Sequence, residues 1–90
     1  MLKPDFTNRF KKDYKRAIKR NLDISLIDSV IADLINEKPL DEKHRDHTLI
    51  GNYVGCRECH ISPDWLLIYQ VGGGIIVFER TGTHSDLFGS

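Results

Sequence analysis

The stretch WLLIYQVGGGIIVFER, residues 65–80, decides the fold. Its first half, Trp65 to Val71, is an apolar run interrupted only by Gln70, and its second half, Ile75 to Arg80, is another short apolar run. Three consecutive glycines, residues 72–74, separate the two. Short apolar runs bounded by glycine predict two buried strands joined by a hairpin loop.

The strands on either side of this hairpin are less distinct. Residues 54–61 alternate loosely between apolar and polar side chains, which predicts a third antiparallel strand. We expect the first residues, Met1 to Lys3, to add an edge strand. The sequence therefore predicts a small, mainly antiparallel sheet of three to four strands, with one face covered by helices and the other left free.

Two helices precede the sheet. Residues 5–19 have apolar side chains every four positions, and residues 22–37 have them three or four apart, as expected for amphipathic helices. Pro39 stops the second helix. The apolar positions of the two helices are Phe6, Phe10, Tyr14, Ile18, Ile27, Val30, Ile31, Leu34 and Ile35. The predicted fold class is α+β, with two N-terminal helices packed on the sheet.

Length and composition restrict the protein class. The chain has 90 residues, with 13 Lys and Arg against 13 Asp and Glu, so we expect one domain over residues 1–90. No apolar run approaches the roughly 20 residues that a membrane helix needs, and the charged N-terminus does not resemble a signal peptide. We therefore expect a cytoplasmic protein with no membrane partner. Residues 1–20 carry eight Lys and Arg against two Asp, a cationic surface suited to a polyanion or simply to solvent.

Three of the four histidines stand where loops meet predicted strands. His47 lies in a polar stretch over residues 40–55, His60 precedes a proline turn, and His84 follows the last strand. Asp64 follows the same proline, so we expect it to face His60 across the turn. A carboxylate beside an imidazole fixes its tautomer. Each of these residues also has an ordinary structural interpretation as a cap, a turn or a core residue.

Imidazoles, a carboxylate and arginines without a serine or cysteine nucleophile suit phosphodiester cleavage in RNA. The 2′-hydroxyl of the substrate attacks its own phosphate, so the enzyme supplies only a base, an acid and charge stabilisation. Histidine titrates in the required range, and the guanidinium groups of Arg57 and Arg80 suit phosphoryl oxygens. Trp65 and Phe88 are candidates for stacking on a base, although Trp65 also fits a core position.

The stretch CRECH, residues 56–60, matches the attachment motif of c-type haem. We reject haem because Met1 is the only methionine and no export signal is present. In a strand, Cys56 and Cys59 point to opposite faces, which also disfavours zinc. We expect no metal and no cofactor.

Three segments resemble the YafQ branch of the RelE-type toxins. They are DHTL at residues 46–49, GCRECHISPDWLLIY at residues 55–69 and FERTGTHSDLF at residues 78–88. The resemblance spans nearly the whole chain, and two helices before a small sheet is also the order of that family. It implies a RelE-like fold.

The resemblance also implies a function. It implies the toxin of a bacterial type II toxin-antitoxin pair, a metal-independent endoribonuclease that cleaves mRNA in the ribosomal A site. Its partners would be a cognate antitoxin, mRNA and the ribosome, with operator DNA bound only by the toxin-antitoxin complex. The catalytic residues that it implies are His47, His60, Asp64 and His84, with Arg57, Trp65, Arg80 and Phe88 as RNA-binding or supporting residues.

Roles follow from the resemblance. His84 is assigned as general acid to the 5′-oxygen and His47 as general base, while His60 and Asp64 orient the phosphate or the imidazoles. Two alternatives stay open: a ParE-like toxin that binds gyrase without nuclease chemistry, and an inactive relative that only binds antitoxin and operator DNA.

Overall fold

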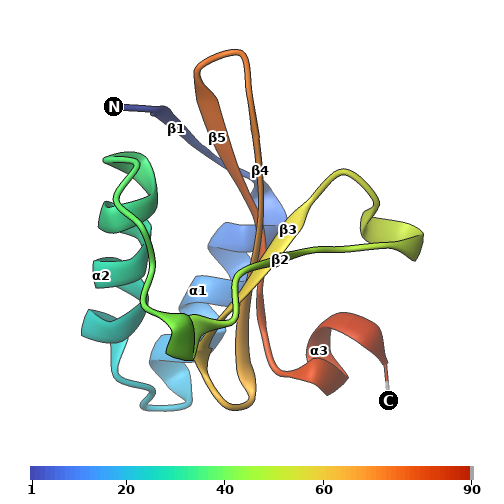
Figure 1. The fold of residues 1–90 in the computed structure, drawn as a ribbon. Coiled ribbons are helices and arrows are strands. Elements are labelled where there is room, and N and C mark those ends of the chain that lie inside the picture. Colours follow the sequence, from blue (N-terminus) through green and yellow to red (C-terminus); the bar gives the residue numbers. More distant parts are fainter. Residues whose placement is uncertain (90) are drawn as a thin grey trace.

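The computed structural model describes residues 1–89 and contains helices packed on a five-stranded sheet (Figure 1). The elements in order are β1 (Lys3–Phe6), α1 (Asn8–Lys19), α2 (Ile24–Ile35), the 3-10 turn η1 (Glu42–His44), β2 (His47–Thr48), the 3-10 turn η2 (Gly51–Tyr53), β3 (Arg57–Ser62), β4 (Trp65–Gly72), β5 (Ile75–Gly82) and α3 (His84–Phe88). The strands lie side by side in the order β1-β5-β4-β3-β2. Among residues 1–89, no helix has the length and apolar character needed to cross a membrane.

The sheet confirms the predicted α+β class, with more strands than expected. The hairpin of β4 and β5 and its antiparallel partner β3 lie where the sequence placed them. The edge strand β1 covers Lys3–Phe6 rather than Met1 to Lys3, and it pairs in parallel with β5. The extra strand is β2, two residues long, which pairs His47 with Glu58 on β3. So short a strand has no periodicity that a sequence pattern could reveal.

Helix α1 begins later than predicted because Thr7 caps it. The Thr7 hydroxyl accepts a hydrogen bond from the Phe10 backbone N–H at 3.0 Å and donates one to the Glu79 carbonyl at 2.8 Å. Phe6 therefore belongs to β1, and Ile18, predicted to be buried, is 51% exposed. The buried face of α1 consists instead of Phe10, Asp13 and Ala17. A charged residue in that position is invisible to an apolar pattern.

Both faces of β4 are covered, which corrects the expectation of a free face. One cluster packs the two long helices against the sheet, with Ile27, Leu67 and Phe78 fully buried in it. On the opposite face Leu66 and Ile68 pack with Leu87 of α3 and with Cys56, Leu49 and Tyr53. The chain after β2 and the short helix α3 form this second layer. Burial on both faces explains the apolar run from Trp65 to Tyr69, whereas the end of β4 from Gln70 onward is exposed.

The hairpin turn demands glycine at two positions. Gly73 and Gly74 have φ values of +57° and +77°, in the left-handed region that a type I′ hairpin turn requires at both central residues. This tight connection sets the register of β4 and β5 from Gly72 opposite Ile75 to Tyr69 opposite Phe78, and an irregularity between Ile68 and Tyr69 shifts the pairing beyond that point.

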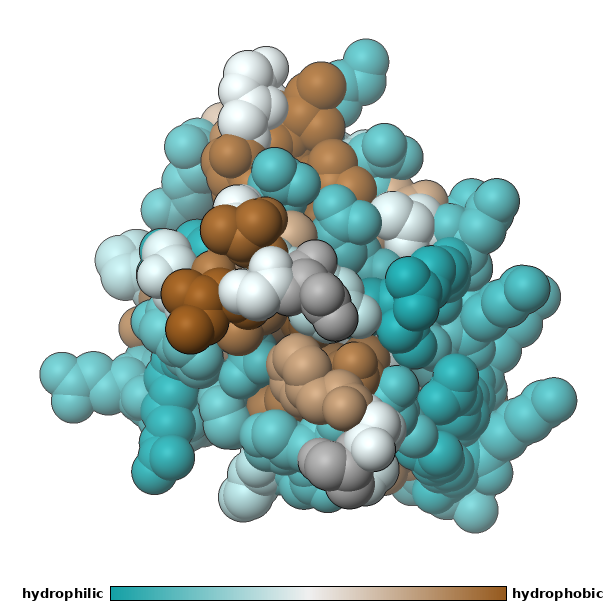
Figure 2. Space-filling model, turned by 90° about the vertical axis from the view of Figure 1, so that its right-hand side faces the viewer, coloured by the Kyte–Doolittle hydropathy of each residue, from teal (hydrophilic) through white to brown (hydrophobic). Residues whose placement is uncertain are grey.

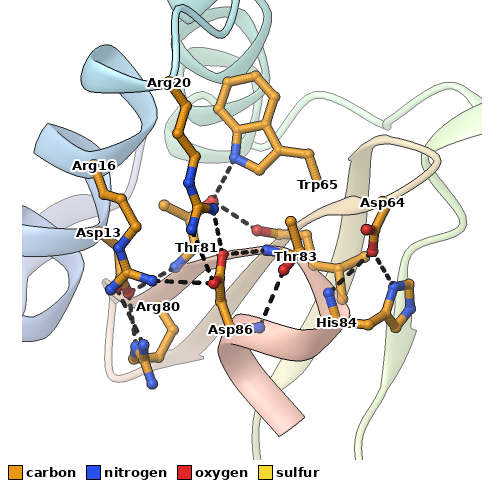
Figure 3. A network of polar contacts seen from close by, with 11 residues as sticks. Asp13, Arg16, Arg20, Asp64, Trp65, Arg80, Thr81, Thr83, His84 and Asp86 are labelled. Carbon is orange, nitrogen blue, oxygen red and sulfur yellow. Dashed lines mark hydrogen bonds and ion pairs between the residues drawn. The ribbon is translucent and has the colours of Figure 1, made fainter. Parts of the chain in front are cut away.

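A buried ion pair joins α1 to β5. The Asp13 carboxylate accepts hydrogen bonds from Arg80 Nε at 2.7 Å, from Arg80 Nη2 at 3.1 Å and from the Thr81 backbone N–H at 3.2 Å (Figure 3). The Thr81 hydroxyl in turn donates to the Leu66 carbonyl at 2.6 Å and accepts from the Trp65 indole at 3.0 Å. Because buried charges are costly unless paired, this network fixes α1 against the sheet.

We expect Asp13→Ala to lower the free energy of unfolding by about 3–5 kcal/mol, because it leaves the buried Arg80 guanidinium without its partner. Urea unfolding of the purified chain measures the change. Asp5→Ala, which removes an exposed carboxylate from β1, serves as the control and should alter stability by less than about 0.5 kcal/mol. Equal effects of the two substitutions would contradict a structural role for the ion pair.

Candidate active site

Three histidines form a row along one end of the sheet. His47 lies on β2, His60 on β3, and His84 is the first residue of α3. The ring centroids of His47 and His60 are 6.3 Å apart, and those of His60 and His84 are 6.0 Å apart. The Phe88 ring continues the row at 6.4 Å from His84. Residues separated by up to 41 positions in the chain are thus neighbours in space.

The start of α3 is built to hold His84 in place. Thr83 caps the helix, and the Asp86 carboxylate accepts a hydrogen bond from the Thr83 backbone N–H at 3.0 Å, completing a capping box. Arg20, the C-cap of α1, reaches the Asp86 carboxylate through Nη1 at 2.6 Å, and Arg16 of α1 reaches it at 3.2 Å. A Cβ at Gly82 would lie 2.9 Å from the Asp86 Cβ, so only glycine allows this approach.

The sequence analysis expected Asp64 to face His60, but in the structure Asp64 pairs with His84. The Asp64 Oδ1 atom accepts the His84 backbone N–H at 3.0 Å and lies 2.6 Å from His84 Nδ1 (Figure 3). The backbone hydrogen bond, followed by the one from the ring, lowers the pKa of the Asp64 carboxyl. Since a carboxylate only accepts, Nδ1 carries a proton and Nε2 is the nitrogen left for chemistry.

Glu58 is the site residue that the sequence analysis missed. It is 5% exposed, and its Oε1 atom lies 3.5 Å from His47 Nε2 and 3.5 Å from His60 Nε2. The sequence pattern could have indicated Glu58, because residues two apart in a strand share a face and Glu58 is two residues before His60. A buried carboxylate between two imidazoles stabilises positive charge on either ring.

Backbone carbonyls orient the rings of His47 and of His44, the fourth histidine. His47 Nδ1 lies 2.6 Å from the Arg45 carbonyl oxygen, and His44 Nδ1 lies 2.7 Å from the His60 carbonyl oxygen. A carbonyl oxygen accepts, so both rings carry a proton on Nδ1. In the neutral form each ring then has its lone pair on Nε2.

Of the predicted RNA-binding or supporting residues, Trp65 and Arg80 lie in buried positions, which fits a supporting place. Trp65 is 4% exposed with its indole hydrogen-bonded to Thr81, and Arg80 is 8% exposed and bonded to Asp13. Figure 3 shows Arg80 turned toward α1 and away from His84. Both side chains are thus held by contacts within the protein.

Arg57 and Phe88 lie nearer the surface. The Arg57 guanidinium donates to both oxygens of Asp46 at 3.2 Å, and it remains partly exposed. Figure 2 looks onto the side of the molecule that carries η2 and α3, where apolar surface gathers in the centre. Phe88, 44% exposed, packs edge-on against Tyr53 at 5.9 Å there. This surface is adjacent to the histidine row and suits a flat apolar group such as a nucleobase.

The cysteines belong to the core. Cys59 packs on the helix side of the sheet and Cys56 on the opposite side, as predicted, and both are free thiols. Burial raises the pKa of the Cys59 thiol to about 12. Within residues 1–89, no group of three or more His, Cys, Asp or Glu side chains is arranged to hold a metal ion.

The arrangement suits proton transfer. Three imidazoles and two carboxylates converge, with His84 paired to Asp64 and Glu58 beside both His47 and His60. Groups of this kind move protons to and from a reacting substrate. The site therefore suits a reaction whose steps are transfers of protons.

Comparison with known proteins gives one consistent result. Among relatives, the mRNA interferase toxin YafQ of Escherichia coli K12 is 41% identical over 86 residues, covering 94% of each chain. A crystal structure of the E. coli DinJ-YafQ complex superposes with a TM-score of 0.91 at 38% identity, covering 98% of this chain and 99% of that one. A metal-bound toxin from Helicobacter pylori superposes with a TM-score of 0.91 at 39% identity, covering 98% and 100%.

The family described as the bacterial toxin of the type II toxin-antitoxin system, YafQ, matches residues 2–89. That match includes every element of the sheet, both long helices and the three histidines of the row. The chain belongs to the YafQ family of bacterial type II toxins.

Proposed function

We propose that this chain is the toxin of a type II toxin-antitoxin pair and acts as an endoribonuclease on translated mRNA. The row of His47, His60 and His84, with Glu58 and Asp64 beside it, is the observation that carries the proposal. The E. coli relative that is 41% identical is named as an mRNA interferase, which supports the same activity.

The reaction begins at the ribose. His47 has its Nδ1 proton committed to the Arg45 carbonyl, so its Nε2 is the atom that accepts the proton of the substrate 2′-hydroxyl. The 2′-oxygen then attacks the adjacent phosphorus. The Glu58 carboxylate, 3.5 Å from that Nε2, stabilises the imidazolium that forms.

The reaction ends at the leaving oxygen. The bond from phosphorus to the 5′-oxygen breaks, and His84 delivers a proton from Nε2 to that oxygen. Asp64 holds the His84 ring through Nδ1, which directs Nε2 toward the substrate. The products are a 2′,3′-cyclic phosphate and a 5′-hydroxyl. His60 lies between the other two rings and faces Glu58, and we assign it to the phosphoryl oxygens on which charge develops.

This chemistry needs no metal or cofactor. The nucleophile comes from the substrate, and cationic imidazoles supply the charge stabilisation that a metal would otherwise give. We therefore propose a metal-independent reaction.

The proposed partners follow from the family. A relative forms a complex with the antitoxin DinJ, and we propose a cognate antitoxin for this chain, with operator DNA bound only by that complex. We also propose the ribosomal A site in the bacterial cytoplasm as the place of cleavage. Helix α1 supports the proposed binding to the ribosome, since Lys11, Lys12 and Lys15 are exposed and suited to rRNA phosphates.

His84→Ala should abolish growth arrest when the chain is expressed in bacteria, because the substitution removes the proton donor. It should leave antitoxin binding intact, because His84 is exposed and lies outside the buried core. Growth curves, mapping of mRNA 5′ ends and co-purification with the antitoxin measure the three effects.

The other outcomes separate the alternatives. Growth arrest by the His84→Ala chain would contradict the acid assignment. Arrest by the wild type with intact mRNA would indicate a binding target such as gyrase, and the absence of arrest despite antitoxin binding would indicate an inactive relative.

Glu58→Gln should lower the cleavage rate by about tenfold or more, since it removes the negative charge that stabilises His47 and His60. The rate is measured on mRNA in a translation extract with the purified chain. Glu79→Gln, which changes a half-buried carboxylate on β5, the strand on the other side of β4, is the matched control and should cleave at the wild-type rate. Equal rates for the two variants would remove Glu58 from the site.

A further inference from the structure

A cavity lies beside the histidine row, on the side away from α3. Its volume is about 540 Å³, and its walls come from α2, from η1 with the residue after it, and from the end of β3 with Pro63. Figure 1 shows η1 between α2 and the sheet, where the chain crosses from one to the other. A volume of this size is within the range of about 300–1,000 Å³ that is usual for small-molecule sites.

The cavity and the histidine row share a wall. His60 lines the cavity and also forms the middle of the row. Two residues of the cavity wall, His44 and Arg45, are also bonded to residues of the histidine row. The His44 ring donates to the His60 carbonyl at 2.7 Å, and the Arg45 carbonyl accepts from the His47 ring at 2.6 Å. A ligand in the cavity would therefore be continuous with a phosphate held by the row.

The walls carry the groups that a nucleotide needs. Lys43 and Arg45 are exposed cations at the lining, suited to the phosphates on either side of a nucleoside. Leu26, 45% exposed on α2, offers an apolar surface to the face of a base. Polar acceptors come from His44 and from the Asp33 carboxylate.

His44 has one ring nitrogen left to accept a hydrogen bond. Its Nδ1 proton is donated to the His60 carbonyl, so the neutral ring presents Nε2 as an acceptor. Asp33 is an acceptor as well. Two acceptors favour a base with an exocyclic amino group, which adenine, cytosine and guanine carry and uracil lacks.

We propose that this cavity is a nucleoside subsite, which holds the RNA unit next to the cleaved phosphate and prefers a base with an amino group. The inference rests on the proposed ribonuclease function and extends it to substrate selection. Lys43 and Arg45 contact the backbone, Leu26 contacts the base, and His44 accepts from the amino group.

The test is an NMR titration of the isotopically labelled chain. The probes are two dinucleotides with a 2′-O-methyl group on the first ribose, which blocks cleavage: adenylyl-adenosine and uridylyl-uridine. The adenosine probe should shift the backbone amides of Ser29, Lys43 and His44, and the uridine probe should bind about fivefold more weakly, the worth of one hydrogen bond.

Three variants locate the binding. Ser29→Trp, at an exposed position of α2 in the cavity lining, should fill the cavity and weaken binding of the adenosine probe by about tenfold. Ala32→Trp is the matched control, because Ala32 is exposed on the same helix and lines a different hollow, between α1 and α2. It should bind as the wild type does. His44→Ala should bind both probes with the affinity that the wild type has for the uridine probe.

The outcomes are distinct from those of the proposed function. If the wild type cleaves mRNA in cells but Ser29→Trp and His44→Ala bind as the wild type does, the subsite is wrong and the ribonuclease stands. Absence of amide shifts at Ser29, Lys43 and His44 with millimolar adenosine probe also overturns the subsite. Should the tryptophan variant fail to fold, the His44→Ala comparison still decides.

Discussion

The Asp13 carboxylate is the constraint on which the rest of the structure depends. It accepts from the Arg80 side chain, from the Thr81 backbone and from Arg16 on its own helix, with almost no access to water. Since Thr81 then binds Trp65, one carboxylate sets the position of α1 relative to β5 and β4. The same helix holds α3 through Asp86. The position of His84 therefore follows from the packing of α1.

The candidate site depends on elements that are far apart in the chain. His47 comes from a two-residue strand, His60 from the end of β3, and His84 from the first turn of α3. Each ring has one nitrogen held by an acceptor or facing a carboxylate, so the protein decides which nitrogen meets the substrate. Fixed rings in a row allow proton removal and proton delivery on opposite sides of one phosphate.

Much of the fold is predictable because it depends on local patterns. The apolar runs and glycines of β4 and β5, and the helical spacing of α2, are properties of adjacent residues. Three features depend on tertiary contacts. Ile18 is exposed because the Thr7 cap delays α1, so that its buried face passes through Asp13. Asp64 pairs with His84, which is 20 positions away in the chain. Arg80 forms a buried ion pair with Asp13 of α1, and the residue pattern of a strand does not show which helix residue will contact it. Glu58 was predictable from strand alternation alone.

The central claim is that the 2′-hydroxyl attacks the phosphate between histidines that move the protons, and the chemistry of the new RNA ends tests it most directly. Wild-type and His84→Ala chains are expressed in bacteria, and the 5′ ends of mRNA are mapped with and without prior treatment with polynucleotide kinase. The account predicts new 5′-hydroxyl ends within translated codons, ligated to an adapter only after kinase treatment and absent with His84→Ala. New ends that carry a 5′-phosphate would contradict it.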